Sequence, residues 1–207
     1  YLAALWNEFE PGLIRIVYIK LSTAKVAGVK IPALDDIIYE LKPFNAFTKP
    51  AYGCSNLKSI NIISFDTSSV TSISYMFKNC FKLTSINLSN FNASNIKTME
   101  SLFYNCSLLT SLELSNFNTL KVEKMNNMFA GCNNLEYLDL SNFDTSKVKS
   151  LEGMFRSCIN LLSLNISNFD TSSVSSMKFM FADCKKLTSV DVEKFDITNP
   201  PFDPKGR

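Results

Sequence analysis

The 207-residue chain contains no histidine. Ser-His and Cys-His catalytic dyads, histidine general bases and histidine metal ligands are therefore excluded together. The chain also has no run of about 18 apolar residues, the minimum for a transmembrane helix, because Arg15 and Lys20 interrupt its longest apolar stretch, residues 13–21. We therefore expect neither histidine-based catalysis nor a transmembrane segment.

Neither sign of charge predominates, since 21 lysines and arginines accompany 19 aspartates and glutamates and the formal net charge is +2. This balance predicts no strong field for a polyanion, so no nucleic-acid partner is expected. The length corresponds to about one domain. The chain begins at Tyr1 without an initiator methionine or a signal-peptide pattern, and we expect a mature or truncated form.

The six cysteines are evenly spaced, each 26 residues after the one before. Other residue types share this period, as in the leucine column Leu57, Leu83, Leu109, Leu135, Leu161 and Leu187. A fixed period of roughly 20 to 50 residues is typical of repeat architectures. We number the repeat units 1 to 6; they begin at Cys54, Cys80, Cys106, Cys132, Cys158 and Cys184.

Each unit changes its hydrophobic period along its length. In unit 1, Ile60 and Ile62 alternate with polar residues, which is typical of a β-strand. Apolar residues at 70–80 then recur at the spacing of a short helix or of 3₁₀ turns. A segment such as Asp144-Thr145-Ser146 separates the two parts in unit 4 and predicts a capped turn. The sequence therefore predicts an α/β repeat solenoid, a stack of six parallel strand/short-helix rungs that share one core.

Unit 3 carries the pattern Cys106-x-x-Leu109-x-x-Leu112-x-Leu114, followed by Val122-x-x-Met125-x-x-Met128-Phe129-x-x-Cys132. This pattern resembles the leucine-rich repeat of BspA-like bacterial surface proteins, with three extra residues between its halves. The longer unit, with Leu-Ser-Asn-Phe-Asp-Thr-Ser at 140–146, resembles the 26-residue repeat of bacterial and mycoplasmal surface lipoproteins. The resemblance covers about residues 54–199. It implies a leucine-rich-repeat-like fold and a non-enzymatic interaction protein, cell-surface or extracellular, without implying a ligand.

The chain divides into three parts. Residues 1–53 do not resemble the repeat; they are rich in β-forming residues, and we interpret them as a β-rich N-terminal cap over the first open face of the stack. Residues 54–199 are the solenoid. All seven prolines lie outside 51–199, and the proline-rich residues 200–207 are expected to form a C-terminal exit.

The cysteine column permits three interpretations. Structural zinc sites usually contain a close cysteine pair, and here no two cysteines are closer than 26 residues. Disulfides between adjacent rungs would need a distorted rung, because strands lie about 4.8 Å apart. Buried free thiols that act as small hydrophobes fit the shared phase of the cysteines with the apolar columns, and we favour this interpretation. No metal and no cofactor is predicted.

A column of acidic and amide residues also recurs, at Asp66, Asn92, Asn118, Asp144, Asp170 and Asp196. A catalytic or Ca²⁺-binding carboxylate would not exchange so freely with an amide, whereas a turn cap would. No cluster of acid, base and nucleophile can be assembled from the sequence, so we expect no enzyme activity.

The outward strand positions carry mostly Thr, Ser and Asn, but units 4 and 5 depart from this pattern. The candidate partner surface consists of Glu136, Tyr137, Asp139, Leu162, Glu113 and Asn165. An aromatic side chain beside an aliphatic one with acidic neighbours is typical of an interface hot spot. For Glu136, Tyr137, Asp139 and Leu162, strand periodicity directs the side chains away from the core, so we do not expect packing to explain them. These four residues also depart from the Thr-Ser-Asn pattern, so we do not expect repetition to explain them either. A solvated sheet face with one tyrosine is the alternative.

Extended solenoids present large binding surfaces. The sequence therefore favours a recognition or adhesion module, cell-surface or extracellular, that binds a protein or glycan through the strand face. The alternative is a structural repeat that self-associates into a surface coat, matrix or fibre. Ice binding by rows of Thr and Ser is disfavoured, because Lys58, Glu136 and Leu162 interrupt the threonine row.

Overall fold

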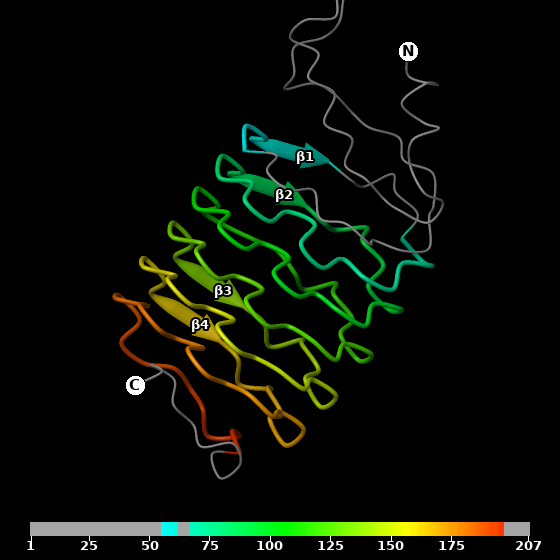
Figure 1. Ribbon diagram of the computed structural model, residues 1–207, viewed down its shortest axis with the longest axis vertical. Coiled ribbons are helices and arrows are strands. Elements are labelled where there is room, and N and C mark those ends of the chain that lie inside the picture. The colour runs from blue at the N-terminus through cyan, green and yellow to red at the C-terminus, as the bar shows by residue number, and fades with distance from the viewer. Residues whose placement is uncertain (1–54, 62–66, 197–207) are drawn as a thin grey trace, which may run out of the picture.

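The computed structural model of the chain describes residues 55–61 and 67–196 (Figure 1). In this part, successive units lie side by side as rungs of one stack, which is the predicted repeat solenoid. The predictions for the N-terminal cap, for Cys54 and for the exit at 200–207 lie outside the described residues. Phe65 and Asp66 lie outside them as well.

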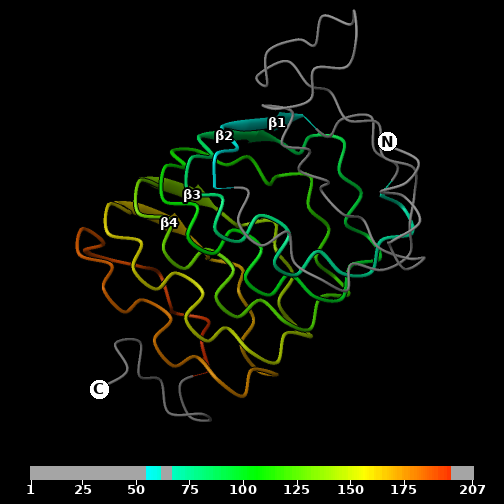
Figure 2. The same cartoon turned by 45° about the horizontal axis from the view of Figure 1, so that its top comes forward.

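Four short strands lie on one side of the stack (Figure 2). They are β1 (Ser59–Asn61), β2 (Ser85–Asn87), β3 (Tyr137–Asp139) and β4 (Ser163–Asn165). Strand β1 pairs in parallel with β2, and β3 with β4. Within the described residues, the equivalent positions of units 3 and 6, 111–113 and 189–191, form no strand. Instead of one ladder of six strands, this side carries two separate two-stranded sheets.

A longer ladder runs along a second side of the stack. Isolated parallel bridges link Ser72, Thr98, Lys124, Ser150 and Ser176 in succession. The residues just before the bridges add further bonds, as between the Lys97 N–H and the Thr71 carbonyl oxygen at 2.8 Å. Evenly spaced parallel bonds of this kind hold units 1 to 5 in register.

The predicted short helix is wrong: within the described residues, turns stand in its place. In unit 1 the Met76 N–H donates to the Ile73 carbonyl oxygen at 3.2 Å. Tyr75, the third residue of this turn, has a φ of 65°, and Asn79 in the following turn has a φ of 62°. A positive φ at the third position defines a type II turn and is incompatible with a continuing α-helix. The Tyr75 N–H instead donates to the Glu100 carbonyl oxygen in unit 2 at 2.8 Å, so turns replace helical bonds with bonds between rungs.

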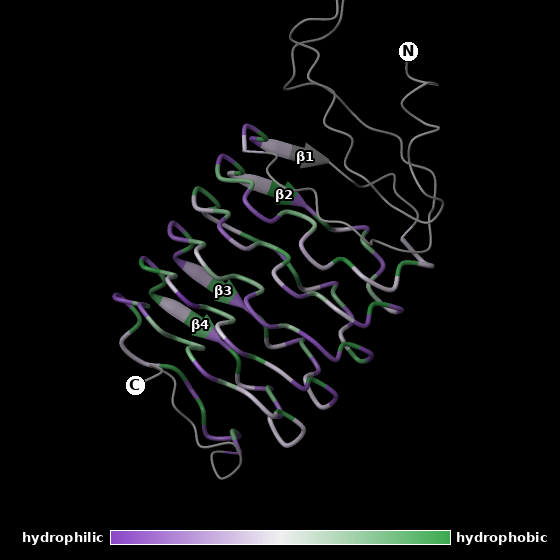
Figure 3. Ribbon diagram, in the orientation of Figure 1, coloured by the Kyte–Doolittle hydropathy of each residue, from purple (hydrophilic) through white to green (hydrophobic). Residues whose placement is uncertain are grey.

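One hydrophobic core runs through the stack. The rings of Phe77, Phe103, Phe129, Phe155 and Phe181 stack in succession, with centroid separations of 5.5, 5.8, 5.7 and 5.7 Å. The leucine column is fully buried at Leu83, Leu109, Leu135 and Leu161. Hydrophobic and hydrophilic residues alternate along the coloured rungs of Figure 3. Each rung therefore contributes one layer to a core that no single unit closes alone.

The Asp/Asn column lies in turns, as predicted. The side-chain oxygens of this column accept the backbone N–H two residues further on, at 2.9–3.1 Å, in Asn92, Asn118, Asp144 and Asp170. This is the geometry of an Asx turn, which an amide and a carboxylate form equally well. The turn part of the prediction is confirmed at these positions, although no helix follows the turn.

Candidate interaction surface

The candidate residues gather on the side of the stack that carries β3 and β4. The parallel register places Tyr137 beside Ser163 and Asp139 beside Asn165. The Leu162 N–H donates to the Glu136 carbonyl oxygen at 2.8 Å, which joins the residues just before the two strands. We call this set the strand patch; it consists of Glu113, Glu136, Tyr137, Asp139, Leu162 and Asn165.

Both large apolar side chains of the strand patch are open to solvent. Tyr137 is 62% exposed and Leu162 is 42% exposed. Leu138 and Leu164, next along the same strands, are buried and pack into the core. Every other unit has serine at the position of Tyr137. Core packing and the repeat pattern therefore leave the tyrosine unexplained, as the sequence predicts.

Three polar members of the strand patch have a structural role, and for Asp139 the expectation that repetition does not explain it is wrong. Their side-chain oxygens accept backbone N–H groups two residues further on: Glu113 from Ser115 at 2.9 Å, Asp139 from Ser141 at 2.9 Å and Asn165 from Ser167 at 3.3 Å. The same bond recurs at Asn87 and Asp191, so this column closes a turn in units 2 to 6. Sequence periodicity places these side chains outward but does not show that they cap the next turn.

These turn bonds also fix the charge of the strand patch. Hydrogen bonds from Ser115 lower the pKa of Glu113, and hydrogen bonds from Ser141 lower the pKa of Asp139. The negative charge of Asp139, which occupies the same column of the next rung, acts on the pKa of Glu113 in the opposite direction and more weakly. Both groups are ionised at neutral pH, so the surface around Tyr137 is acidic.

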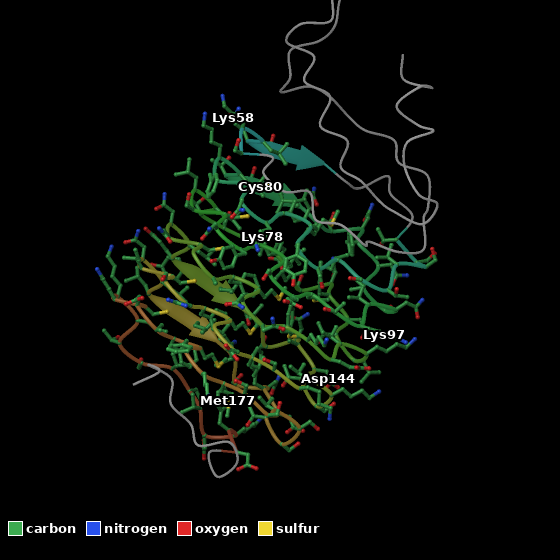
Figure 4. The ribbon with its side chains drawn as sticks, viewed as in Figure 1. Lys58, Lys78, Cys80, Lys97, Asp144 and Met177 are labelled. Carbon is green, nitrogen blue, oxygen red and sulfur yellow. The ribbon has the colours of Figure 1, made fainter. Side chains whose placement is uncertain are left out.

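A second charged surface was not foreseen from the sequence. Five exposed lysines lie on the side of the second ladder in units 2 to 4, and we call them the basic edge: Lys97, Lys121, Lys124, Lys147 and Lys149. Figure 4 places Lys97 at the end of the rungs away from Lys58, which precedes β1. Leu120, 49% exposed, directly precedes Lys121, and the other described units have serine at its position. The overall charge conceals this surface because it sums over the whole chain.

The cysteine column is a line of buried thiols, as predicted. The five described cysteines carry thiols, and all except Cys184 are fully buried. The Cys132 thiol donates to the Phe103 carbonyl oxygen at 3.3 Å, and Cys106, Cys158 and Cys184 make the equivalent bond. Burial raises the pKa of Cys106 to about 12 and that of Cys184 to about 11. Protonated thiols of this kind are poor nucleophiles at neutral pH.

Residues 55–61 and 67–196 contain no group of three or more potential ligands placed to hold a metal ion. No helix in these same ranges is long and apolar enough to cross a membrane. Within these ranges, the strand patch and the basic edge are two surfaces whose side chains the core does not explain.

The rungs, their parallel register and the shared core define a repeat solenoid. Residues 44–136 and 125–201 match the family described as "Mycoplasma protein of unknown function, DUF285". These spans cover most of the chain, which therefore belongs to this family. The match agrees with the resemblance to mycoplasmal repeats predicted from residues 54–199. A comparison with curated proteins gives no match.

Three solved structures are similar to this chain. A leucine rich cell surface protein from Faecalibacterium prausnitzii A2-165 is 21% identical, with a TM-score of 0.43; the match covers 64% of this chain and 38% of that protein. The leucine-rich repeat protein of T. pallidum is 19% identical, with a TM-score of 0.39, over 66% of this chain and 67% of that one. A leucine-rich repeat protein from Eubacterium ventriosum is 21% identical, with a TM-score of 0.41, over 74% and 41%. We draw no functional conclusion from these similarities.

Proposed function

We propose that the chain is a non-enzymatic interaction module, located at the cell surface or outside the cell, that binds a protein or glycan partner through the strand patch. The observation that carries this proposal is Tyr137, which is 62% exposed where every other unit has serine. Exposed aromatic side chains surrounded by polar groups are the usual anchors of protein interfaces. The surface location follows from the resemblance of the repeat to surface-protein repeats.

The neighbours of Tyr137 support the same role. Leu162, in the adjacent rung, supplies a second exposed apolar group, and Glu136 is joined to it through the backbone bond at 2.8 Å. Short strands fixed by parallel pairing hold these side chains on a rigid support. A rigid anchor loses little conformational entropy on binding.

The test uses the purified chain against two probe sets, a panel of extracellular-matrix proteins and a glycan array. We expect Tyr137→Ser, which introduces the residue of the other units, to weaken binding to the recognised probe at least tenfold, or about 1.4 kcal/mol. Phe81→Ser is the matched control, because Phe81 is 42% exposed elsewhere and unit 3 has serine at its position. Unchanged binding by Tyr137→Ser, or equal losses in both variants, would count against the strand patch.

A further inference from the structure

The strand patch carries negative charge without compensation in its own columns. Glu113, Glu136 and Asp139 supply three carboxylates on adjacent rungs. In units 2 to 5 the same three columns contain no lysine or arginine; Lys58, in unit 1, is the basic residue in these columns. This side of the molecule is therefore acidic around an apolar centre formed by Tyr137 and Leu162.

The basic edge has the opposite character. The Glu123 N–H donates to the Lys97 carbonyl oxygen and the Lys149 N–H to the Glu123 carbonyl oxygen, both at 2.8 Å, so these three residues follow one another along the stack. Lys124 lies in the bridge ladder beside them. At a rung spacing of about 4.8 Å, Lys97 and Lys149 are about 10 Å apart along the stack. The lysines thus form a row that a surface of similar length can face.

Four carboxylates lie within or beside this region in units 2 to 4, those of Glu100, Glu123, Asp144 and Glu152. Asp144 accepts hydrogen bonds from the backbone N–H and the hydroxyl of Ser146, at 2.9 and 2.6 Å. Glu100 accepts a hydrogen bond from the Tyr75 hydroxyl, and Glu152 accepts one from the Ser176 hydroxyl. Five lysines against four carboxylates leave the basic edge positive, opposite in sign to the strand patch. Exposed Leu120 gives the basic edge an apolar group, as Tyr137 and Leu162 do for the strand patch.

We propose that the strand patch of one copy of this chain binds the basic edge of a second copy. The inference rests on the proposed function and names a second copy as a partner of the strand patch. Opposite charges steer the two surfaces together, whereas two strand patches facing each other would oppose like charges. The contact is therefore heterologous and leaves one free surface of each kind, so copies add head to tail into a ring or an open chain.

The test measures the mass of the full chain by sedimentation at several concentrations. We expect mass to rise with concentration at about 20 mM salt and to return to that of the monomer at about 500 mM, because salt screens exposed charges. Two variants each remove the charge of one surface, by introducing residues that other units have at the same repeat positions. The strand variant is Glu113→Asn, Glu136→Thr and Asp139→Asn; the edge variant is Lys121→Asn, Lys124→Ser and Lys149→Ser.

Each variant alone should remain monomeric at low salt. Mixed in equal amounts they should form a dimer and nothing larger, because the edge variant keeps the acidic surface and the strand variant keeps the basic one. The control variant Lys82→Asn with Lys185→Ser also removes positive charge with residues of other units, and it should assemble like the parent.

A parent chain that stays monomeric at low salt overturns the inference, as does a mixture of variants that forms no dimer. Retention of the monomeric parent on immobilised heparin, lost in the edge variant, would assign the basic edge to a polyanion and would also overturn it. The proposed function is judged separately. If self-association is absent while Tyr137→Ser still weakens probe binding, the strand patch keeps its role and only the second copy is rejected.

Discussion

Thr145 is joined to Asp170 of the next unit by two hydrogen bonds through a single hydroxyl group. Its Oγ1 donates to the Asp170 carbonyl oxygen at 2.8 Å and accepts the Asp170 N–H at 2.8 Å. Thr145 is fully buried. The same pair of hydrogen bonds joins Thr67 to Asn92 and Thr119 to Asp144. At these turns a side chain thus supplies the link between rungs that backbone pairing supplies along the ladders.

We expect Thr145→Val to destabilise the chain by about 1–3 kcal/mol, because it removes both hydrogen bonds that the buried hydroxyl makes with the backbone of Asp170, each contributing about 0.5–1.5 kcal/mol. Valine has the shape of threonine, so packing changes little. The free energy of unfolding in urea measures the loss. Thr110→Val, at an exposed position, is the control and should change stability by less than about 0.5 kcal/mol. Equal effects of the two substitutions would contradict the role of the hydroxyl.

Unit 2 has alanine at this position, so the link between rungs is interrupted there. Ala93 is buried, and it faces Asn118 of unit 3 as Thr145 faces Asp170. We expect Ala93→Thr to raise the free energy of unfolding by about 1 kcal/mol, the typical net contribution of a hydrogen bond. Ala93→Val adds similar volume without the hydroxyl. If valine stabilises as much as threonine, the gain comes from packing and the hydrogen-bond prediction is wrong.

The buried columns could be predicted from the sequence because every unit repeats them in the same phase. The local conformation could not, because apolar residues at 70–80 have the same spacing on a helix and in successive type II turns. The distinguishing signal was the glycines: between 67 and 196 the chain has only Gly131 and Gly153, and both have positive φ, 76° and 60°. Asn79, Asn105 and Asp183 occupy the column of Gly131, and Asn127 occupies that of Gly153; Asn and Asp tolerate positive φ better than most residues.

The candidate surface was predicted in part. Tyr137 is exposed, as strand periodicity requires. Leu162 is exposed as well, but it precedes β4, and strict alternation from the exposed Ser163 would have buried it. The turn role of Glu113 and Asp139 was hidden, since it depends on the direction of the chain two residues later. The basic edge was hidden for a different reason: lysines at three positions of the repeat become neighbours only once the rungs are stacked.

A side chain at position 131 would be opposed both by the backbone conformation and by contact with Asn105. Its φ of 76° is left-handed, and an added Cβ would overlap Asn105 Oδ1 and lie 3.2 Å from Asn105 Cα. We expect Gly131→Ala to destabilise the chain by about 1–2 kcal/mol, through the left-handed backbone and the overlap together. In an Asn105→Gly background the overlap disappears, and the cost of Gly131→Ala should fall without vanishing. Thermal or urea unfolding measures both costs; an unchanged cost in that background would show that the overlap is unimportant.

The buried thiols predict a sensitivity to alkaline pH. Burial raises the pKa of Cys106 to about 12 and also raises the pKa of Cys132 and Cys158 above the ordinary value of 9.0. Above pH 9 the unfolded chain loses these protons while the folded chain keeps them. The unfolded state then binds fewer protons, so the free energy of unfolding falls as pH rises from 9.0 toward the folded pKa.

Each such thiol should contribute a slope of about 1.4 kcal/mol per pH unit within this window and nothing below about pH 8. Urea unfolding at several pH values between 7 and 10.5 (about half-unit steps) measures the slope. Cys106→Ala should lower stability at pH 7 by loss of packing, yet it should reduce the alkaline slope by about 1.4 kcal/mol per unit because one titrating thiol is gone. Leu109→Ala removes a comparable buried group without a thiol and should leave the slope intact. Parallel curves for the parent and Cys106→Ala above pH 9 would mean that the folded core does not hold this thiol protonated.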